Sequence, residues 1–402
     1  MKIIEGGVCA AKGFKAGALH CGIRKSQTKK DLAMIRSDCL CNAAAVYTKN
    51  QVKAAPVLLT KEHLADGKAQ AVIINSGNAN ACAPFGMEHA RRQGLAAARA
   101  LEVEEENVVV ASTGIIGQTL PVEAIEAHAA EMKMKYDNSL AAVEAIMTTD
   151  TKIKTFAVEF EAGGTLCHMG GICKGSGMIH PNMGTMLCFI TTDCAISANM
   201  MKKALLFYVD KTFNRVTVDG DTSTNDMCVV MANGMAGNKE ITEENESYDA
   251  YCEALHAVMK DLARKIAGDG EGASRLITCT VTGAEDEAKA EILAKSIASS
   301  SLTKAAMFGS DANWGRVLCA MGYSGASFDT KAVQIEFASA EGCIAVCENG
   351  QGLDFDEALA KKILNQDEVE IRVSLKEGCG TATCWGCDLT YDYVRINGDY
   401  RS

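Results

Sequence analysis

The residues best suited to chemistry are Gly184 and Thr185, which follow a glycine-rich turn and Pro181 and precede an apolar run at 186–190. The threonine hydroxyl can attack the Gly184 carbonyl, and an N-to-O acyl shift then leaves an ester that water hydrolyses. Gly184 has no Cβ, so its peptide can adopt the strained geometry that this step needs. The freed α-amine, with an unperturbed pKa near ~8, can then act as general base for the same hydroxyl. From the residues alone, an ordinary strand threonine is the simpler interpretation.

Other polar segments could serve such a nucleophile. Thr113 and Gly114 follow the apolar run 108–110, and small residues with free backbone amides at a strand end can stabilise an oxyanion. The asparagine-rich stretch 75–80 is typical of a structural turn. Thr148 and Thr149 stand in a hydroxyl-rich stretch beside a carboxylate, which also fits a simple helix cap.

Two segments raise the question of a metal or a redox site. The stretch 219–226 holds three aspartates, which could bind Mg²⁺ or Ca²⁺, but its spacing is not that of an EF-hand, and a polar catalytic or structural loop fits better. Cys379, Cys384 and Cys387 lack an identifiable fourth zinc ligand. A redox pair at 384–387 should be followed by a helix, whereas 388–394 reads as a strand. We therefore expect no metal site, and reduced thiols near a strand.

Composition limits the class of protein to which the chain can belong. The chain has 402 residues, 48% hydrophobic and 23% charged, a net charge of −11 and 18 scattered cysteines. This is a globular composition, and the acidic balance disfavours a general nucleic-acid binder. The N-terminus shows no apolar signal region and no run is long enough to span a membrane, so we expect a cytoplasmic protein with reduced thiols.

Alternating short strands and helices predict an α/β (α+β) fold. Strands are expected at 71–74, 108–110, 155–160, 166–171, 186–190, 215–218, 276–281 and 388–396, and helices at 86–101, 121–134, 139–146, 198–213, 243–267, 286–299, 317–321 and 356–364.

Taken in order, these motifs resemble the ornithine acetyltransferase (glutamate N-acetyltransferase) family of arginine biosynthesis. The resemblance runs along nearly the whole chain, and its motifs are 12–14, 75–80, 112–117, 147–151, 174–178, 181–187, 218–226, 269–273, 313–316, 385–393 and 397–402. It implies a layered αββα sandwich like that of N-terminal-nucleophile enzymes, with a smaller C-terminal α/β portion.

The resemblance also implies self-cleavage between Gly184 and Thr185. The products would be an α chain, 1–184, and a β chain, 185–402, assembled as an α₂β₂ heterotetramer. Thr185 would be the nucleophile, and Thr113 and Gly114 would form the oxyanion hole. The family's substrate-binding positions fall on Thr148 or Thr149, Lys174, Thr185, Glu271, Asn397 and Ser402.

The implied reaction is ping-pong transfer of acetyl from N²-acetyl-L-ornithine to L-glutamate, with no cofactor; acetyl-CoA is open as a second donor. Lys174 suits an α-carboxylate and Glu271 a cationic side chain. A related aminopeptidase or amidohydrolase is the first alternative, and a thiol- or metal-binding protein the second. The chain departs from the family at Gly184, where alanine is commoner, and at His180, which could modulate proton transfer or fill space.

Overall fold

The computed structural model describes every residue except 27, 181–185 and 400–402. The chain forms two compact units. Unit 1 contains 1–175, 181–214 and 222–262, and unit 2 contains 176–180, 215–221 and 263–402. In the described part of the chain, no helix has the length and apolarity needed to cross a membrane.

Unit 1 is built on a nine-stranded sheet in the order β1-β6-β7-β8-β9-β3-β4-β5, with β2 paired to β3. The strands are β1 (Lys2–Ile4), β2 (Phe14–Leu19), β3 (Leu32–Tyr47), β4 (Lys68–Asn78), β5 (Val108–Ile115), β6 (Lys154–Ala162), β7 (Thr165–Lys174), β8 (Leu187–Thr192) and β9 (Met227–Ala232). The pairs β4–β5 and β8–β9 are parallel, whereas β7 and β8 run antiparallel with Lys174 opposite Leu187. Residues 175–186 therefore connect two neighbouring strands of one sheet.

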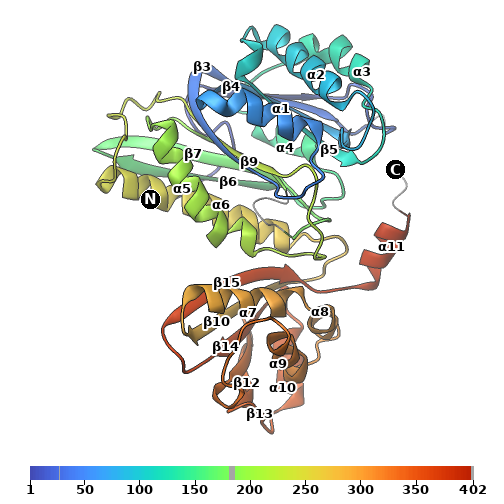
Figure 1. The fold of residues 1–402 in the computed structure, drawn as a ribbon, viewed down its shortest axis with the longest axis vertical. Helices are drawn as coiled ribbons and strands as arrows, with labels where there is room; N and C mark the ends of the chain where they lie inside the picture. The colour runs from blue at the N-terminus through green and yellow to red at the C-terminus, as the bar shows by residue number, and fades with distance from the viewer. Residues whose placement is uncertain (27, 181–185, 400–402) are drawn as a thin grey trace. The chain divides into compact units, whose positions relative to one another are not determined.

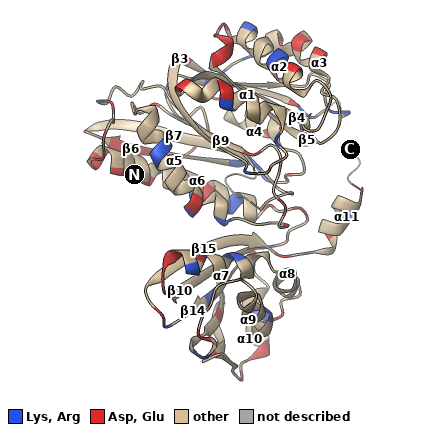
Figure 2. Ribbon diagram, viewed as in Figure 1, with Lys and Arg blue, Asp and Glu red and all other residues tan. Residues whose placement is uncertain are grey.

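Six α-helices accompany this sheet among the described residues. They are α1 (Ala55–His63), α2 (Gly86–Leu101), α3 (Val122–His128), α4 (Ser139–Ile146), α5 (Ala198–Lys211) and α6 (Glu246–Ala267), most of which belongs to unit 1. Helices α1–α3 pack on β4 and β5 through one apolar cluster, and α4 packs inside a second cluster formed with β3, β4, β8 and β9 (Figure 1). Both α2 and α3 carry charged residues (Figure 2), and Arg92 of α2 forms an ion pair with Glu126 of α3.

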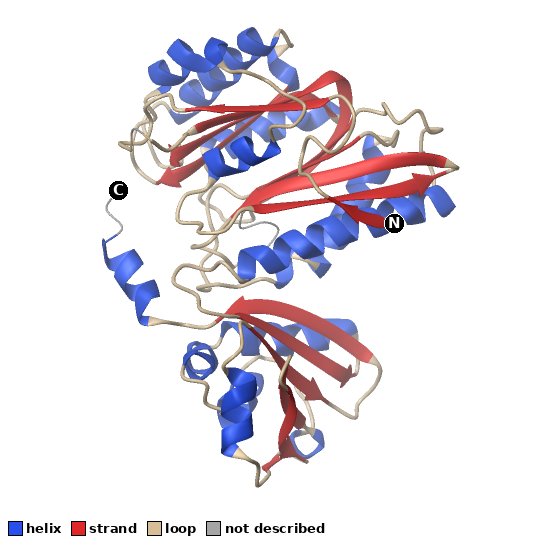
Figure 3. Cartoon of the chain, turned by 180° about the vertical axis from the view of Figure 1, so that it is seen from behind, coloured by secondary structure: helices blue, strands red, loops and turns tan. Residues whose placement is uncertain are grey.

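Unit 2 has a six-stranded sheet in the order β13-β12-β11-β14-β10-β15. Its strands are β10 (Leu276–Ala284), β11 (Gln334–Ser339), β12 (Gly342–Glu348), β13 (Gln351–Gly352), β14 (Glu368–Ser374) and β15 (Gly380–Cys387). Its helices are α7 (Glu287–Ser299), α8 (Ser301–Phe308), α9 (Trp314–Gly322), α10 (Glu357–Leu364) and α11 (Tyr391–Asp399). One apolar cluster joins α7, α9 and α10 to the sheet (Figure 3).

The predicted mixed α/β class is confirmed, and α2 and α4 have the predicted bounds. Two predicted strands are wrong. Residues 215–218 form the end of a 3₁₀ helix, Phe213–Arg215, and a single bridge from Val216 to Trp385. The strand predicted at 388–396 is also wrong, because residues 391–399 form α11. The predicted helix at 121–134 is shorter, because after α3 only a 3₁₀ turn, Ala129–Glu131, follows.

Candidate active site

In unit 1, the carboxyl ends of β5 and β7 bring two predicted site residues together. Lys174 Nζ lies 3.2 Å from Thr113 Oγ1, and both residues are buried. The backbone beside them is tightly constrained, because Gly114 has φ +135° and a Cβ there would lie 2.3 Å from the Gly77 carbonyl carbon. Thr113 and Gly114, the predicted oxyanion-hole positions, thus lie at the end of β5, where only glycine fits at residue 114.

The asparagine-rich turn after β4 supports this strand end. Ser112 Oγ donates to Asn75 Oδ1 at 2.6 Å, and Asn225 Nδ2 donates to the carbonyls of Ala79 (2.6 Å) and Ser112 (2.8 Å). All of these groups are buried, where an unmade hydrogen bond is costly. These contacts favour a structural role for the asparagine-rich turn, as the sequence predicted.

Asp150 is an acidic residue whose importance the sequence reasoning missed. Its carboxylate accepts hydrogen bonds from Lys154 Nζ at 2.7 Å, from the Gly175 amide at 2.7 Å and from the Thr148 amide at 3.0 Å. Burial opposes its ionisation, but the positive charges of Lys174 and Lys154 and these hydrogen bonds hold the pKa of Asp150 well below its usual range. It does not cap α4, which ends at Ile146; instead it fixes the chain next to Lys174. The signal available in the sequence was the Asp150–Lys154 spacing.

Asp226 is a second buried acid near Lys174. Burial raises its pKa well above the ordinary value, although hydrogen bonds from Ser223 and the charge of Lys174 oppose the rise. Its Oδ2 has no hydrogen-bond partner among the described residues. A raised pKa favours the protonated, neutral carboxyl group, so Asp226 competes less with an anionic ligand for Lys174 than an ordinary aspartate would.

The two threonine candidates differ in their surroundings. Thr148 lines a pocket of about 260 Å³ together with Arg24, Lys29 and Lys30, whereas Thr149 is not among the residues that line it. Arg24 also donates to the Met147 carbonyl. Glu144 and Asp150 line the same pocket, so its lining is of mixed charge.

Unit 2 brings together the other two described candidates. Asn397 Nδ2, on α11, donates to Glu271 Oε2 at 2.8 Å. Gly177 packs against the same carboxylate, since a Cβ at residue 177 would lie 2.4 Å from Glu271 Oε2. Burial, followed by the negative charges of Asp219 and Glu271, raises the pKa of Tyr393 above its ordinary value. The negative potential around Glu271 suits a cationic group.

Gly184, Thr185 and Ser402 lie outside the described residues, so the predicted nucleophile, cleavage site and C-terminal contact stay predictions. His180, next to them, is described. Its Nδ1 lies 3.0 Å from Thr217 Oγ1, and burial together with the positive charge of Lys295 lowers its pKa to about 4. The imidazole is therefore neutral near pH 7.

The segments weighed for metal or redox chemistry have other structural roles. Within the ranges that the structure describes, no group of three or more His, Cys, Asp or Glu side chains could hold a metal ion. Cys384 and Cys387 both lie in β15, and Lys304 Nζ lies 3.5 Å from Cys387 Sγ. The helix that should follow a redox pair does exist, as α11, but the two cysteines lie within a strand and not at a helix N-terminus.

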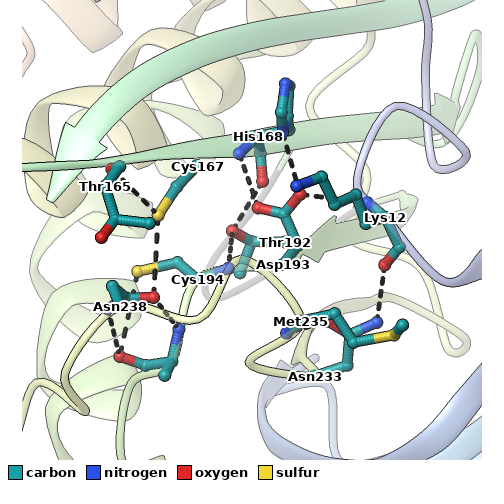
Figure 4. Close-up of polar contacts among 11 residues, drawn as sticks. Lys12, Thr165, Cys167, His168, Thr192, Asp193, Cys194, Asn233, Met235 and Asn238 are labelled. Carbon is teal, nitrogen blue, oxygen red and sulfur yellow. Dashed lines mark hydrogen bonds and ion pairs between the residues drawn. The ribbon is translucent and has the colours of Figure 1, made fainter.

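A further polar cluster lies at the opposite end of β7 from Lys174. The buried Asp193 carboxylate accepts from the His168 amide (2.7 Å), from His168 Nδ1 (2.9 Å) and from the Lys12 amide (3.1 Å) (Figure 4). Cys167 and Cys194 lie beside it, and a hydrogen bond from Cys194 lowers the pKa of Cys167. The cluster ties the N-terminal segment to the sheet, which gives the Lys12 motif a structural role.

Comparison with known proteins shows the family to which the chain belongs. The model of the family described as the ArgJ family matches residues 15–402. The chain belongs to the ArgJ family. It is 50% identical over 405 residues to the arginine biosynthesis bifunctional protein ArgJ of Caldanaerobacter subterraneus subsp. tengcongensis, with 100% of both chains covered. It is 48% identical over 395 residues to the protein of that name from Thermotoga neapolitana, covering 97% of this chain and 99% of the relative.

A solved structure of an ArgJ family member is also similar. The arginine biosynthesis bifunctional protein ArgJ of Bacillus halodurans shares 46% identity and aligns with a TM-score of 0.50, over 52% of this chain and 97% of the other. This supports the predicted fold class. The family resemblance inferred from the sequence motifs is therefore confirmed.

Proposed function

We propose that this ArgJ family member transfers the acetyl group of N²-acetyl-L-ornithine to L-glutamate through an ester on Thr185. The observation that carries the proposal is the pairing of Lys174 with Thr113 beside the constrained Gly114, on a chain that matches the family from residue 15 to its last residue. The names of its relatives, which place them in arginine biosynthesis and call them bifunctional, support it.

The precursor first cleaves itself. Thr185 Oγ attacks the Gly184 carbonyl carbon, the Gly184–Thr185 C–N bond breaks as the α-amine takes a proton, and water hydrolyses the ester. The products are an α chain, 1–184, and a β chain, 185–402, which we propose assemble as α₂β₂. The free α-amine of Thr185 then serves as the general base of the transferase.

Acetyl transfer follows in two half-reactions. Thr185 Oγ attacks the acetyl carbonyl, the amide C–N bond breaks, and ornithine leaves with the proton that the α-amine removed from the hydroxyl. Glutamate's amine then attacks the ester, and the hydroxyl recovers its proton. Thr113 and Gly114 stabilise the oxyanion in both steps, a contribution of about 3–4 kcal/mol for one such donor.

Charges in each unit suit an amino-acid substrate. Lys174 pairs with an α-carboxylate, and the raised pKa of the nearby Asp226 favours a neutral side chain that does not compete for the ammonium group. Glu271, held by Asn397, pairs with the cationic side chain of ornithine. Thr148, which lines the pocket beside Arg24, contacts substrate in preference to Thr149, and Ser402 supplies a further contact. No cofactor is required, and acetyl-CoA is proposed as an alternative acetyl donor at the same threonine.

The test is to incubate the purified protein with acetylornithine, with and without glutamate, and to measure ornithine, acetate and acetylglutamate. The proposal predicts acetylglutamate formation that depends on glutamate and is lost in Thr185→Ala. Ornithine release that ignores glutamate and yields only acetate would favour the aminopeptidase-like hydrolase instead. A parallel assay with acetyl-CoA as donor tests the second activity.

A further inference from the structure

The segment that precedes the proposed cleavage site, Ser176–His180, belongs to unit 2. Its backbone is bound at two loops of that unit. The Glu271 amide donates to the Ser176 carbonyl at 2.8 Å, and Ser176 Oγ donates to the Asp269 carbonyl at 2.7 Å. Ser176 is 1% exposed, so this end of the segment is buried.

The other end of the segment is bound by one carboxylate. Asp219 Oδ2 accepts from the Met178 amide at 2.6 Å, and Asp219 Oδ1 accepts from the Ile179 amide at 2.8 Å. The Val218 amide donates to the Ile179 carbonyl at 2.7 Å. Charge-assisted hydrogen bonds of this kind are about twice as strong as neutral ones.

These hydrogen bonds hold the backbone in an uncommon conformation. Met178 has φ +55°, a left-handed value that costs a side-chain-bearing residue free energy and persists only where the surroundings enforce it. Asp219 enforces it through the amides of Met178 and Ile179. Asp219 is itself anchored, since the Thr217 amide donates to the Trp385 carbonyl on β15 at 2.9 Å.

We propose that Asp219 is a positioning residue for self-cleavage: it fixes the backbone at Met178 and Ile179 so that the chain enters the cleavage segment in one conformation. This inference rests on the proposed self-cleavage. Restricting the approach of a nucleophile to its carbonyl is a large source of rate in intramolecular reactions. In this proposal Asp219 acts only through the backbone of Met178 and Ile179, and the acyl shift remains the work of Thr185.

Asp219→Asn tests the proposal with little change of shape. An asparagine offers one acceptor oxygen where the amides of Met178, Ile179 and Asp221 share two, so at least one amide loses its partner. Cell-free synthesis of the full chain, followed by denaturing electrophoresis over time, measures the rate at which the precursor becomes two fragments. We expect Asp219→Asn to cleave about tenfold more slowly or worse, the effect of one lost hydrogen bond to a charged group. Asp221→Asn, at an exposed neighbouring carboxylate, is the matched control and should cleave at the wild-type rate.

Hydroxylamine distinguishes a role of Asp219 in the acyl shift from a role in the later hydrolysis of the ester. It cleaves the ester formed by the acyl shift, so it should not restore the rate of Asp219→Asn if the shift itself is slowed. Restoration by hydroxylamine, or a wild-type rate without it, would overturn the proposal.

Folding is checked by thermal unfolding of Asp219→Asn on the uncleavable Thr185→Ala background. If that variant does not fold, Asp219→Glu, which keeps the carboxylate but displaces it by one methylene, must slow cleavage several-fold, and a wild-type rate refutes the proposal. Cleavage of Thr185→Ala itself would instead refute the proposed function.

Discussion

Replacing Asp150 by asparagine should destabilise unit 1 strongly while leaving the shape of the side chain almost unchanged. The carboxylate and Lys154 form a pair at 2.7 Å, with side-chain exposures of 0% and 1%. Removing one partner of a buried ion pair typically costs about 3–5 kcal/mol, because the other charge stays buried without its counterion. Asparagine also offers poorer acceptors to the Gly175 and Thr148 amides.

The expected size follows from these contacts. A loss of about 3–5 kcal/mol in a unit of this size lowers the melting temperature by about 6–20 °C. Differential scanning calorimetry at pH 7 measures it. The matched control is Glu126→Gln, which breaks the ion pair of Glu126 with Arg92; this pair is partly exposed and should shift the melting temperature by no more than about 4 °C.

A double variant separates the charge from the packing. Asp150→Asn combined with Lys154→Met removes both charges, and buried ion pairs are often replaced by apolar groups at little cost. The double variant should therefore melt well above Asp150→Asn alone. The pH dependence has a defined sign: the pKa of Asp150 is lowered in the folded state, so its stabilisation is present above about pH 4 and is lost only as the pH falls further. A shift in Asp150→Asn no larger than in Glu126→Gln would refute the buried-pair argument.

Two further predictions concern residues beside the site. Gly114→Ala should abolish acetyl transfer and lower the melting temperature, because the new Cβ would meet backbone atoms of Gly77 and Asn78 at 2.3–2.8 Å; a variant with wild-type transfer would contradict the close approach of β4 and β5. His180→Gln should flatten the stability profile of the protein between about pH 4 and 6.5. The pKa of His180 is lowered to about 4, so the native state loses stability as the pH falls from the ordinary value of 6.5 towards 4. Urea titrations across this range check it, and an unchanged profile in the variant would show that His180 does not titrate in this way.

The sequence predicted most elements with strong periodicity and missed those set by tertiary contacts. α2 and α4 were predictable because their apolar and alanine-rich residues repeat at helical spacing. α11 was not, since alternating aromatic residues such as Tyr391 and Tyr393 imitate a strand, and Tyr391 is largely exposed. The stretch 215–218 looked like a strand, but it forms only one bridge to β15.

The candidate site shows the same division. Lys174, Thr113, Glu271 and Asn397 came from motif order, and the structure brings the first two together in unit 1 and the last two together in unit 2. The buried acid Asp150 was missed, because the Asp150–Lys154 spacing alone does not reveal that the carboxylate will be buried against Lys174 and the Gly175 amide. Such electrostatic environments are properties of the packed fold.

The most direct test of the central claim is mass spectrometry of the purified protein after brief exposure to acetylornithine without glutamate. Two chains should be found, the second beginning at Thr185, and a peptide map should place one acetyl group on that threonine. Adding glutamate should remove the acetyl group and produce acetylglutamate. An active protein that remains a single uncut chain, or that carries the acetyl group on another residue, would contradict the account.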